Sequence, residues 1–197
     1  MTNKRLFIIS VLIIAAMAVV AGAFFFYQPT LAPSDTQNPP PNPNMEAIMG
    51  LPKRLVVPAI SVDAPVINVG LTADGSVDVP KGPTEVAWYQ LGPRPGEKGS
   101  AVITGHYGPW RTGASSVFDN LNKLKAGDKI YVKDDKGKEL VFAVKETRMY
   151  DPGESPTEVF NKTDGVYLNL ITCQGDWLAS QKTYNQRLVV FTELIKE

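Results

Sequence analysis

The sequence has one cysteine, one histidine and no excess of either charge. Cys173 is the only thiol among its 197 residues and His106 the only imidazole, while 20 basic side chains balance 20 acidic ones. A single cysteine excludes an intrachain disulfide, and one His with one Cys cannot complete a tetrahedral zinc site without carboxylates. The zero net charge gives no electrostatic reason to expect a nucleic-acid partner. We therefore predict no metal, no cofactor and no nucleic acid.

The N-terminus contains a long apolar run. Residues 6–27 hold no charged or amide side chain, and a helix of that length, rising about 1.5 Å per residue, crosses a hydrocarbon core of roughly 30 Å. Lys4 and Arg5 precede the run, so the positive-inside bias places the N-terminus in the cytoplasm. We expect residues 1–27 to be a cytoplasmic tip and a single-pass anchor in the cell membrane, with the rest extracytoplasmic. The alternative is a cleaved signal peptide.

Residues 28–51 differ in composition from what precedes and follows them. They include a Pro-Pro-Pro run, several Asn and few apolar side chains. Such a segment buries too little surface to offset chain entropy, and proline holds it extended. We predict an extracytoplasmic linker here, followed by one domain over residues 52–197 that is large enough for a single core.

The domain itself is rich in short β-branched and aromatic segments separated by Gly, Pro, Asn and Asp. This texture is typical of a mainly-β barrel or sandwich. The segments are RLVVPAI (54–60), VDAPVINVG (62–70), GSVDVP (75–80), VAWYQL (86–91), GSAVITGH (99–106), KIYVKDD (129–135), KELVFAVKETRMYD (138–151), GVYLNLITC (165–173) and QRLVVFTELI (186–195). Turns are predicted at 74–75 and 136–137. Helices are predicted at 115–124, capped by Ser115 or Ser116, and at 155–161, with Ser155 as cap and Pro156 at the first position.

Cys173 and His106 occupy similar places in the sequence. Each ends a predicted strand, and a glycine lies within two residues after it. A thiol needs a base or a cationic partner to become a good nucleophile near neutral pH, and imidazole is the usual choice. Either residue alone is more often structural, but their common position at strand ends favours a catalytic pair.

Arg187 is a third candidate. It opens the predicted strand that follows the one closed by Cys173. If these strands pair antiparallel, the guanidinium lies near the sulfur, where it stabilises a thiolate, a substrate carbonyl or the oxyanion of a tetrahedral intermediate. The alternative is a surface arginine paired with Asp176.

Together these residues resemble the motifs of the sortases, which are membrane-anchored cysteine transpeptidases. The resemblance rests on AVITGH (101–106), LITC (170–173) and Arg187, and it extends over roughly residues 52–195, closest in texture to the class E and F branch. It implies an eight-stranded sortase-like β-barrel with short helices. It also implies that Cys173 is the nucleophile, that His106 is the general acid and base, and that Arg187 positions the substrate or its oxyanion.

The resemblance also implies the partners. Cys173 would form an acyl-enzyme with a secreted surface protein at a C-terminal sorting signal of the Leu-Pro-x-Thr-Gly kind. An amine acceptor, such as a peptidoglycan stem peptide or a pilin lysine, would then release it. The backbone N–H of Gln174 is a further candidate oxyanion donor. We expect the loops 148–164 and 174–186 to select the substrate.

Neighbouring residues are candidates for substrate binding. Thr172 precedes the nucleophile, and Thr104 shares a strand face with His106 by the two-residue period. Tyr107, Trp110 and Trp177 flank the motifs and are suited to an apolar groove. For each of these residues, a purely structural role is the alternative.

Two other functions compete with the transpeptidase. An L,D-transpeptidase-like cell-wall cross-linker is also β-rich and Cys–His based, but its Ser-His-Gly-Cys type motif differs from the ITCQG found here. A non-catalytic, anchored adhesion or pilus β-domain would hold Cys173 inert and buried. Selective labelling of Cys173 that depends on His106 would favour the enzyme.

Overall fold

We describe the protein from a computed structural model, over residues 49–110, 113–154 and 156–195. Within these ranges, no helix is both long and apolar enough to cross a membrane. The predicted span at 6–27 and most of the linker lie outside the described residues, so the anchor stays a prediction.

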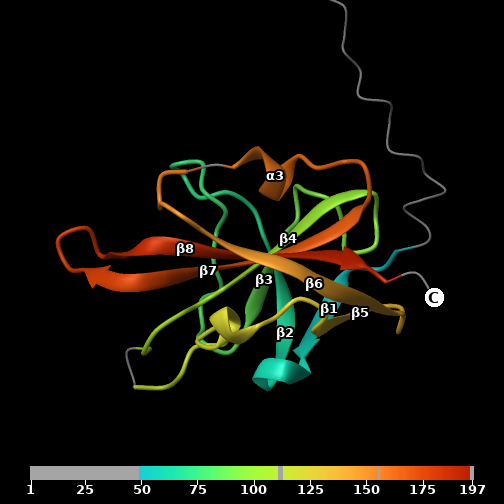
Figure 1. Ribbon diagram of the computed structural model, residues 1–197, viewed down its shortest axis with the longest axis horizontal. Helices are drawn as coiled ribbons and strands as arrows, with labels where there is room; N and C mark the ends of the chain where they lie inside the picture. The colour runs from blue at the N-terminus through green and yellow to red at the C-terminus, as the bar shows by residue number, and fades with distance from the viewer. Residues whose placement is uncertain (1–48, 111–112, 155, 196–197) are drawn as a thin grey trace, which may run out of the picture. The chain divides into compact units, whose positions relative to one another are not determined.

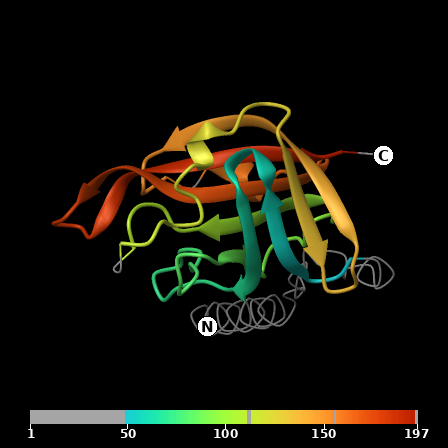
Figure 2. The same ribbon diagram turned by 90° about the horizontal axis from the view of Figure 1, so that it is seen from below.

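The described residues form eight strands that close into a barrel (Figure 1, Figure 2). The strands are β1 (Pro52–Val57), β2 (Val62–Val69), β3 (Val86–Tyr89), β4 (Gly99–Gly105), β5 (Lys129–Asp134), β6 (Glu139–Tyr150), β7 (Val166–Leu178) and β8 (Thr183–Leu194). Their order around the barrel is β1-β2-β3-β4-β7-β8-β6-β5. The pairs β2–β3 and β4–β7 are parallel and the others antiparallel. The predicted mainly-β, eight-stranded barrel is therefore confirmed.

The barrel interior is filled by alternate side chains of the strands. Leu168 and Leu170 of β7 and Leu188 and Val190 of β8 all belong to one large buried cluster. Strand β4 differs, because all seven of its residues are buried. A strand buried on both faces needs a covering layer outside the barrel as well as the core inside it.

That covering layer is the connection between β6 and β7, which includes the short helix α3 (Thr157–Phe160). Val159 of α3 packs with Val102 of β4 and Val189 of β8 in a second, smaller cluster. In Figure 1, α3 lies beside the ribbon of β4, over the region where β4, β7, β8 and β6 run next to one another. The outer face of these four strands is thus covered in its middle.

The predicted helix at 115–124 is wrong. The segment is a run of turns that ends in a 3-10 helix, η2 (Leu121–Lys123). The carboxylate of Asp119 accepts hydrogen bonds from the backbone N–H groups of Ser116 and Gly108, and the Ser116 hydroxyl donates to the Gly108 carbonyl instead of capping a helix. These side-chain bonds compete with the i→i+4 pattern of an α-helix and tie the segment to the residues after β4.

The predicted strand at 75–80 is also wrong. Only an isolated bridge between Leu71 and Val77 forms there. The carbonyl of Asp78 accepts a hydrogen bond from the Thr104 hydroxyl at 3.3 Å. The segment is thus attached to β4 through a side chain and not through a ladder of backbone hydrogen bonds.

The other local predictions hold with small shifts. Gly75 and Gly137 lie in turns with φ of 84° and 82°, a conformation that glycine adopts without strain. The second predicted helix is α3, where Pro156 is the N-cap residue and not the first helical residue.

The strand that contains Cys173 is longer than predicted. The expected loop 174–186 is mostly a continuation of the β7–β8 hairpin, which projects as a long two-stranded arm in Figure 1. The register shifts between Gln174 and Trp177, where Gly175 has φ of 84° and a Cβ would meet the Asn185 side chain. This bulge allows the ladder to continue beyond Cys173.

Candidate active site

Cys173 and Arg187 are directly opposite each other in the antiparallel pair β7–β8. Directly opposed residues point to the same face of a sheet, with Cβ atoms about 4.5–5.5 Å apart. Leu170 and Leu188 point into the barrel, so the alternation places Cys173 and Arg187 on its outer face. Arg187 lies inside β8 and does not open it as predicted, because β8 begins at Thr183.

His106 reaches the same place from β4. This strand pairs in parallel with β7, and Thr104 is the partner of Ile171. Extending that register by two residues brings His106 level with Cys173. The three candidate catalytic residues thus come together from three neighbouring strands.

The site lies in a cavity of about 600 Å³ on the outer face of the sheet. Thr104, His106, Thr172, Cys173 and Arg187 all line it. Its remaining lining comes from the segment after β2, from β3, from the end of β6, from the α3 connection and from further residues of β4, β7 and β8: Leu71, Asp74, Gly75, Ser76, Val77, Val79, Tyr89, Gly105, Tyr150, Pro152, Glu154, Pro156, Val159, Phe160, Ile171 and Val189. The predicted loop 148–164 therefore forms one wall of the cavity.

Cys173 is half-buried and carries a free thiol. Burial raises the pKa of the Cys173 thiol above its ordinary value, and the positive charge of Arg187 partly opposes that rise. The resting sulfur is therefore a thiol at neutral pH, and it needs a proton acceptor when it attacks.

His106 is held by two contacts. Its Nε2 lies 2.6 Å from the carbonyl oxygen of Pro80. Its ring packs at 4.7 Å between centroids against Trp110, tilted by 55°. The imidazole is thus restrained on one edge and one face.

The Arg187 guanidinium is held by its own hairpin. One terminal nitrogen donates to the carbonyls of Tyr184 and Gln186 at 3.0 and 2.9 Å, and the other donates to the Thr183 hydroxyl at 2.9 Å. Among the described residues Arg187 forms no ion pair, and Asp176 does not contact it as the alternative proposed. Its positive charge is oriented by neutral acceptors and is not neutralised.

Thr172 has a structural hydrogen bond. Its hydroxyl donates to the Gly105 carbonyl at 2.7 Å, and its side chain is buried. This bond supports the structural role that was the alternative to substrate binding. Thr172 precedes Cys173 in the sequence, and Gly105 precedes His106. The hydrogen bond between them therefore fixes the positions of the two strand ends relative to each other.

A family model, the sortase domain, matches residues 55–195, which is most of the chain. The chain belongs to the sortase family. Sortases are cysteine transpeptidases, so the L,D-transpeptidase interpretation is displaced. A search of curated protein sequences found no match.

Solved sortase structures share the fold. Sortase C-1 from Actinomyces oris is 28% identical, with a TM-score of 0.55 over 74% of this chain and 73% of that one. The Sortase D5 transpeptidase of Clostridium perfringens is 23% identical, with a TM-score of 0.55 over 75% and 79%. Sortase A from Corynebacterium diphtheriae is 20% identical, with a TM-score of 0.55 over 75% and 61%. Assignment of this sortase to class E or F stays a prediction.

An aromatic group lies on the hairpin side of the sortase site. Tyr184 packs edge-on against Tyr107 and Trp177, with ring centroids 5.1 and 5.2 Å away, and Trp177 is 54% exposed. The Gln174 amide donates to the Tyr107 hydroxyl at 3.3 Å, while its side-chain carbonyl oxygen is buried and accepts no hydrogen bond from the described part of the chain. Tyr107, Trp110, Trp177 and Gln174 are thus near the site but do not line the cavity.

Two contributors were missed from the sequence. Tyr184 fell in the predicted loop, although it lies on β8, two residues before Gln186. The polar residues around it hid the strand pattern. The carbonyl of Pro80 left no signal at all, because every residue carries a carbonyl.

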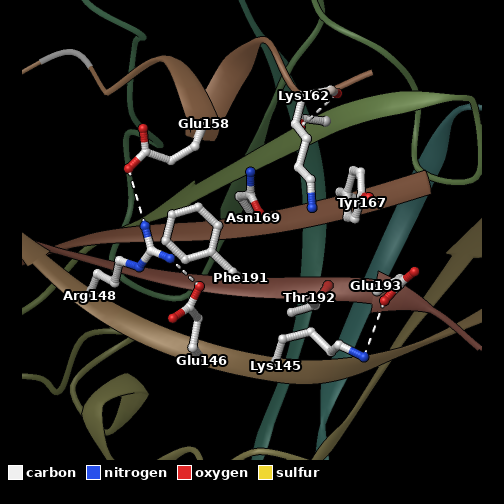
Figure 3. Close-up of a pocket in the computed structure, with 11 residues that line it drawn as sticks. Lys145, Glu146, Arg148, Glu158, Lys162, Tyr167, Asn169, Phe191, Thr192 and Glu193 are labelled. Atoms are coloured by element: carbon white, nitrogen blue, oxygen red, sulfur yellow. Dashed lines mark hydrogen bonds and ion pairs between the residues drawn. The ribbon is translucent and has the colours of Figure 1, made fainter. Parts of the chain in front are cut away.

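A second cavity, of about 390 Å³, lies at the other end of the same outer sheet face (Figure 3). Its floor includes the Phe191 ring, with the Arg148 guanidinium 5.2 Å from the ring centroid. Figure 3 shows Arg148 between Glu146 and Glu158, and Lys145 beside Glu193. The Lys145 Nζ lies 3.1 Å from a carboxylate oxygen of Glu193. Residues of α3 line both cavities, Glu158 this one and Val159 the catalytic one.

Proposed function

We propose that this sortase cleaves a C-terminal sorting signal of the Leu-Pro-x-Thr-Gly kind through an acyl-enzyme at Cys173. The observation that carries the proposal is the convergence of Cys173, Arg187 and His106 in one cavity from three adjacent strands. The protein product is then transferred to an amine acceptor.

The first half-reaction forms the acyl-enzyme. The Cys173 sulfur attacks the carbonyl carbon of the scissile peptide bond while its proton passes to His106. The carbonyl oxygen becomes negative and is stabilised by the Arg187 guanidinium and the Gln174 backbone N–H. The carbon–nitrogen bond then breaks, and the His106 imidazolium gives its proton to the leaving amine.

The second half-reaction runs the same path in reverse. An acceptor amine gives a proton to His106 and attacks the thioester carbonyl, and the carbon–sulfur bond breaks to restore the Cys173 thiol. Because burial raises the pKa of that thiol, the sulfur regains its proton once the acyl group has left.

The cavity walls favour an apolar stretch of peptide. Ile171 and Val189 are directly opposite each other, two residues along the strands from Cys173 and Arg187, and both line the cavity. Phe160 and Tyr89 line it too, with their rings packed edge-on at 6.3 Å between centroids. Apolar walls with a few polar groups at one end suit a Leu-Pro pair that precedes the reacting carbonyl.

The cellular setting of the proposal follows the sequence. A single-pass anchor at 6–27 and the linker at 28–51 place the catalytic domain outside the membrane, where secreted surface proteins and their amine acceptors meet. The acceptor is a peptidoglycan stem peptide or a pilin lysine. The aromatic group of Tyr107, Tyr184 and the exposed Trp177 suits an approaching ammonium group, because ring faces attract cations.

The test is to trap the intermediate. The protein is incubated with a library of sorting-signal peptides without an acceptor, and the adduct is located by mass spectrometry. We expect an acyl group on Cys173 whose mass corresponds to the peptide cleaved before its C-terminal portion. A protein that stays unmodified with every peptide, or that is acylated elsewhere, would contradict the proposal.

A further inference from the structure

His106 faces a backbone carbonyl that belongs to no strand. The carbonyl oxygen of Pro80 lies 2.6 Å from Nε2, and Pro80 is buried. A carbonyl oxygen only accepts hydrogen bonds, so this contact requires a proton on Nε2. A neutral imidazole carries one proton, and the lone pair is therefore on Nδ1.

The segment that carries this carbonyl is anchored on both sides of it. The Thr104 hydroxyl donates to the Asp78 carbonyl at 3.3 Å, and the backbone N–H of Val117 donates to the Pro83 carbonyl at 2.7 Å. Pro80 and Pro83 each have a restricted φ, which stiffens the chain between the two anchors. The Pro80 carbonyl is thus presented to His106 by a segment attached before and after it.

We propose that the Pro80 carbonyl is the positioning group of the catalytic histidine and that Nδ1 is the nitrogen that exchanges protons with Cys173. This inference rests on the proposed function. The thiol proton passes to Nδ1 as sulfur attacks, and the resulting imidazolium keeps donating from Nε2 to the Pro80 oxygen. The proton on Nδ1 then passes to the leaving amine, which restores the same tautomer.

The arrangement is that of a triad in which a backbone carbonyl takes the place of a carboxylate. A third group that accepts from the far nitrogen of the imidazole sets its tautomer, holds its ring and favours its charged form. Among the described residues, no Asp or Glu accepts a hydrogen bond from His106. A carbonyl supplies the same orientation without a negative charge.

The first experiment observes the tautomer directly. The sequence has one histidine, so 15N-histidine labelling of the full 197-residue chain gives the two ring signals of His106 alone. At a pH where the ring is neutral, we expect a pyrrole-like signal for Nε2 and a pyridine-like signal for Nδ1. The opposite assignment, or two averaged signals, would overturn the proposal. No turnover is needed, so failure here is separate from failure to trap acyl-Cys173.

The second experiment weakens the carbonyl without changing any bond of the imidazole. Incorporation of the α-hydroxy analogue of residue 81 converts the peptide bond between Pro80 and Lys81 into an ester, whose carbonyl is a poorer acceptor. We expect kcat to fall roughly 10-fold to 100-fold, the usual effect of losing a group that orients a functional side chain, with KM unchanged.

The matched control is the ester between Lys125 and Ala126. It weakens a carbonyl that accepts from the backbone N–H of Asp128 and not from His106, and that does not anchor the Pro80 segment. We expect this variant to keep its kcat and to retain the Nε2–H tautomer, while the residue 81 ester shows averaged ring signals. Full kcat in the residue 81 ester, or equal losses in the two esters, would overturn the proposal.

Discussion

The two cavities of this sortase lie on the outer face of the same four strands, on either side of α3. They differ in the partners of their positively charged side chains. In the second cavity, the cations Lys145 and Arg148 are each paired with a carboxylate. In the catalytic cavity, Arg187 donates to neutral oxygens and pairs with no carboxylate of the described residues. The charge of a paired cation is neutralised within the protein, whereas an oriented cation without a carboxylate partner can stabilise an oxyanion. The difference locates the chemistry better than cavity shape does.

The largest effect that tests this contrast is the loss of the nucleophile. We expect Cys173→Ala to abolish both acylation and transfer, because no other thiol exists in the chain. The measurement is product formation by liquid chromatography with a sorting-signal peptide and an amine. Circular dichroism checks that the barrel is retained. Activity close to that of the wild type would remove Cys173 from the mechanism.

The next effect compares arginines in the two cavities. Arg187→Lys should lower kcat/KM by about 10²-fold to 10³-fold, because a point charge cannot replace the planar fork that donates along the hairpin. Arg148→Lys, the matched control in the second cavity, should stay within about two-fold, since exposed ion pairs contribute little. Equal losses in both variants would mean that the planar guanidinium of Arg187 has no specific role in the catalytic cavity.

The placement of Cys173 opposite Arg187 was predictable from the sequence, and the reason is physical. Two strands joined by one connection pair antiparallel, and the two-residue period then decides which side chains share a face. The apolar runs that end at Cys173 and continue from Arg187 provided that pattern. The barrel as a whole followed from many such segments in the same way.

The parts that were not predicted depend on contacts between distant residues. The hairpin continues past Cys173 because Trp177 and Tyr184 pack across it, although Gly175 and the polar residues around it favour a loop. The segment 115–124 has helical spacing, but the hydrogen bonds that Asp119 accepts from the Ser116 and Gly108 N–H groups override it. Local propensity carries no information about such partners.

A third prediction separates stability from function by using two similar threonines. Thr172 donates to the Gly105 carbonyl beside the catalytic cavity, and Thr192 donates to the Leu168 carbonyl beside the second one, both from buried side chains. Each Thr→Val change should cost about 1 kcal/mol of unfolding free energy, which lowers the thermal midpoint by about 2–4 °C.

Only one of the two changes should affect catalysis. Thr172→Val frees the end of β4 that carries His106, and we expect roughly ten-fold lower kcat, because small misplacements of reacting groups are costly. Thr192→Val should leave kcat unchanged. Peptide kinetics and thermal unfolding are measured on the same samples. Similar kcat values for both variants would show that the Gly105 bond has no role beyond stability.

A fourth prediction concerns the ionisation of Cys173. Burial raises its pKa and Arg187 lowers it, so alkylation by iodoacetamide should keep accelerating as pH rises beyond the ordinary thiol pKa. Arg187→Gln should move that profile to still higher pH, and Arg148→Gln should not. Because the folded pKa lies above the unfolded one, the unfolding free energy should fall over the same pH interval. Cys173→Ala should lack that decrease. An unshifted profile in Arg187→Gln would exclude its charge from the environment of the sulfur.

The smallest effect concerns the wall that the two cavities share. Glu158 accepts from the Tyr150 hydroxyl at 2.9 Å and pairs with Arg148 at 3.3 Å, and the side chains of the ion pair are 41% and 46% exposed. Glu158→Gln keeps an acceptor for Tyr150, which lines the catalytic cavity, and removes only the charge. We expect an unchanged kcat and a KM within about two-fold of the wild type, because the ion pair is screened by water while the hydrogen bond remains. Glu158→Leu removes both contacts and should raise KM further, since α3 is then held to β6 by neither. A Glu158→Gln variant with the KM of Glu158→Leu would mean that paired charge, and not the Tyr150 contact, holds the wall of the cleft.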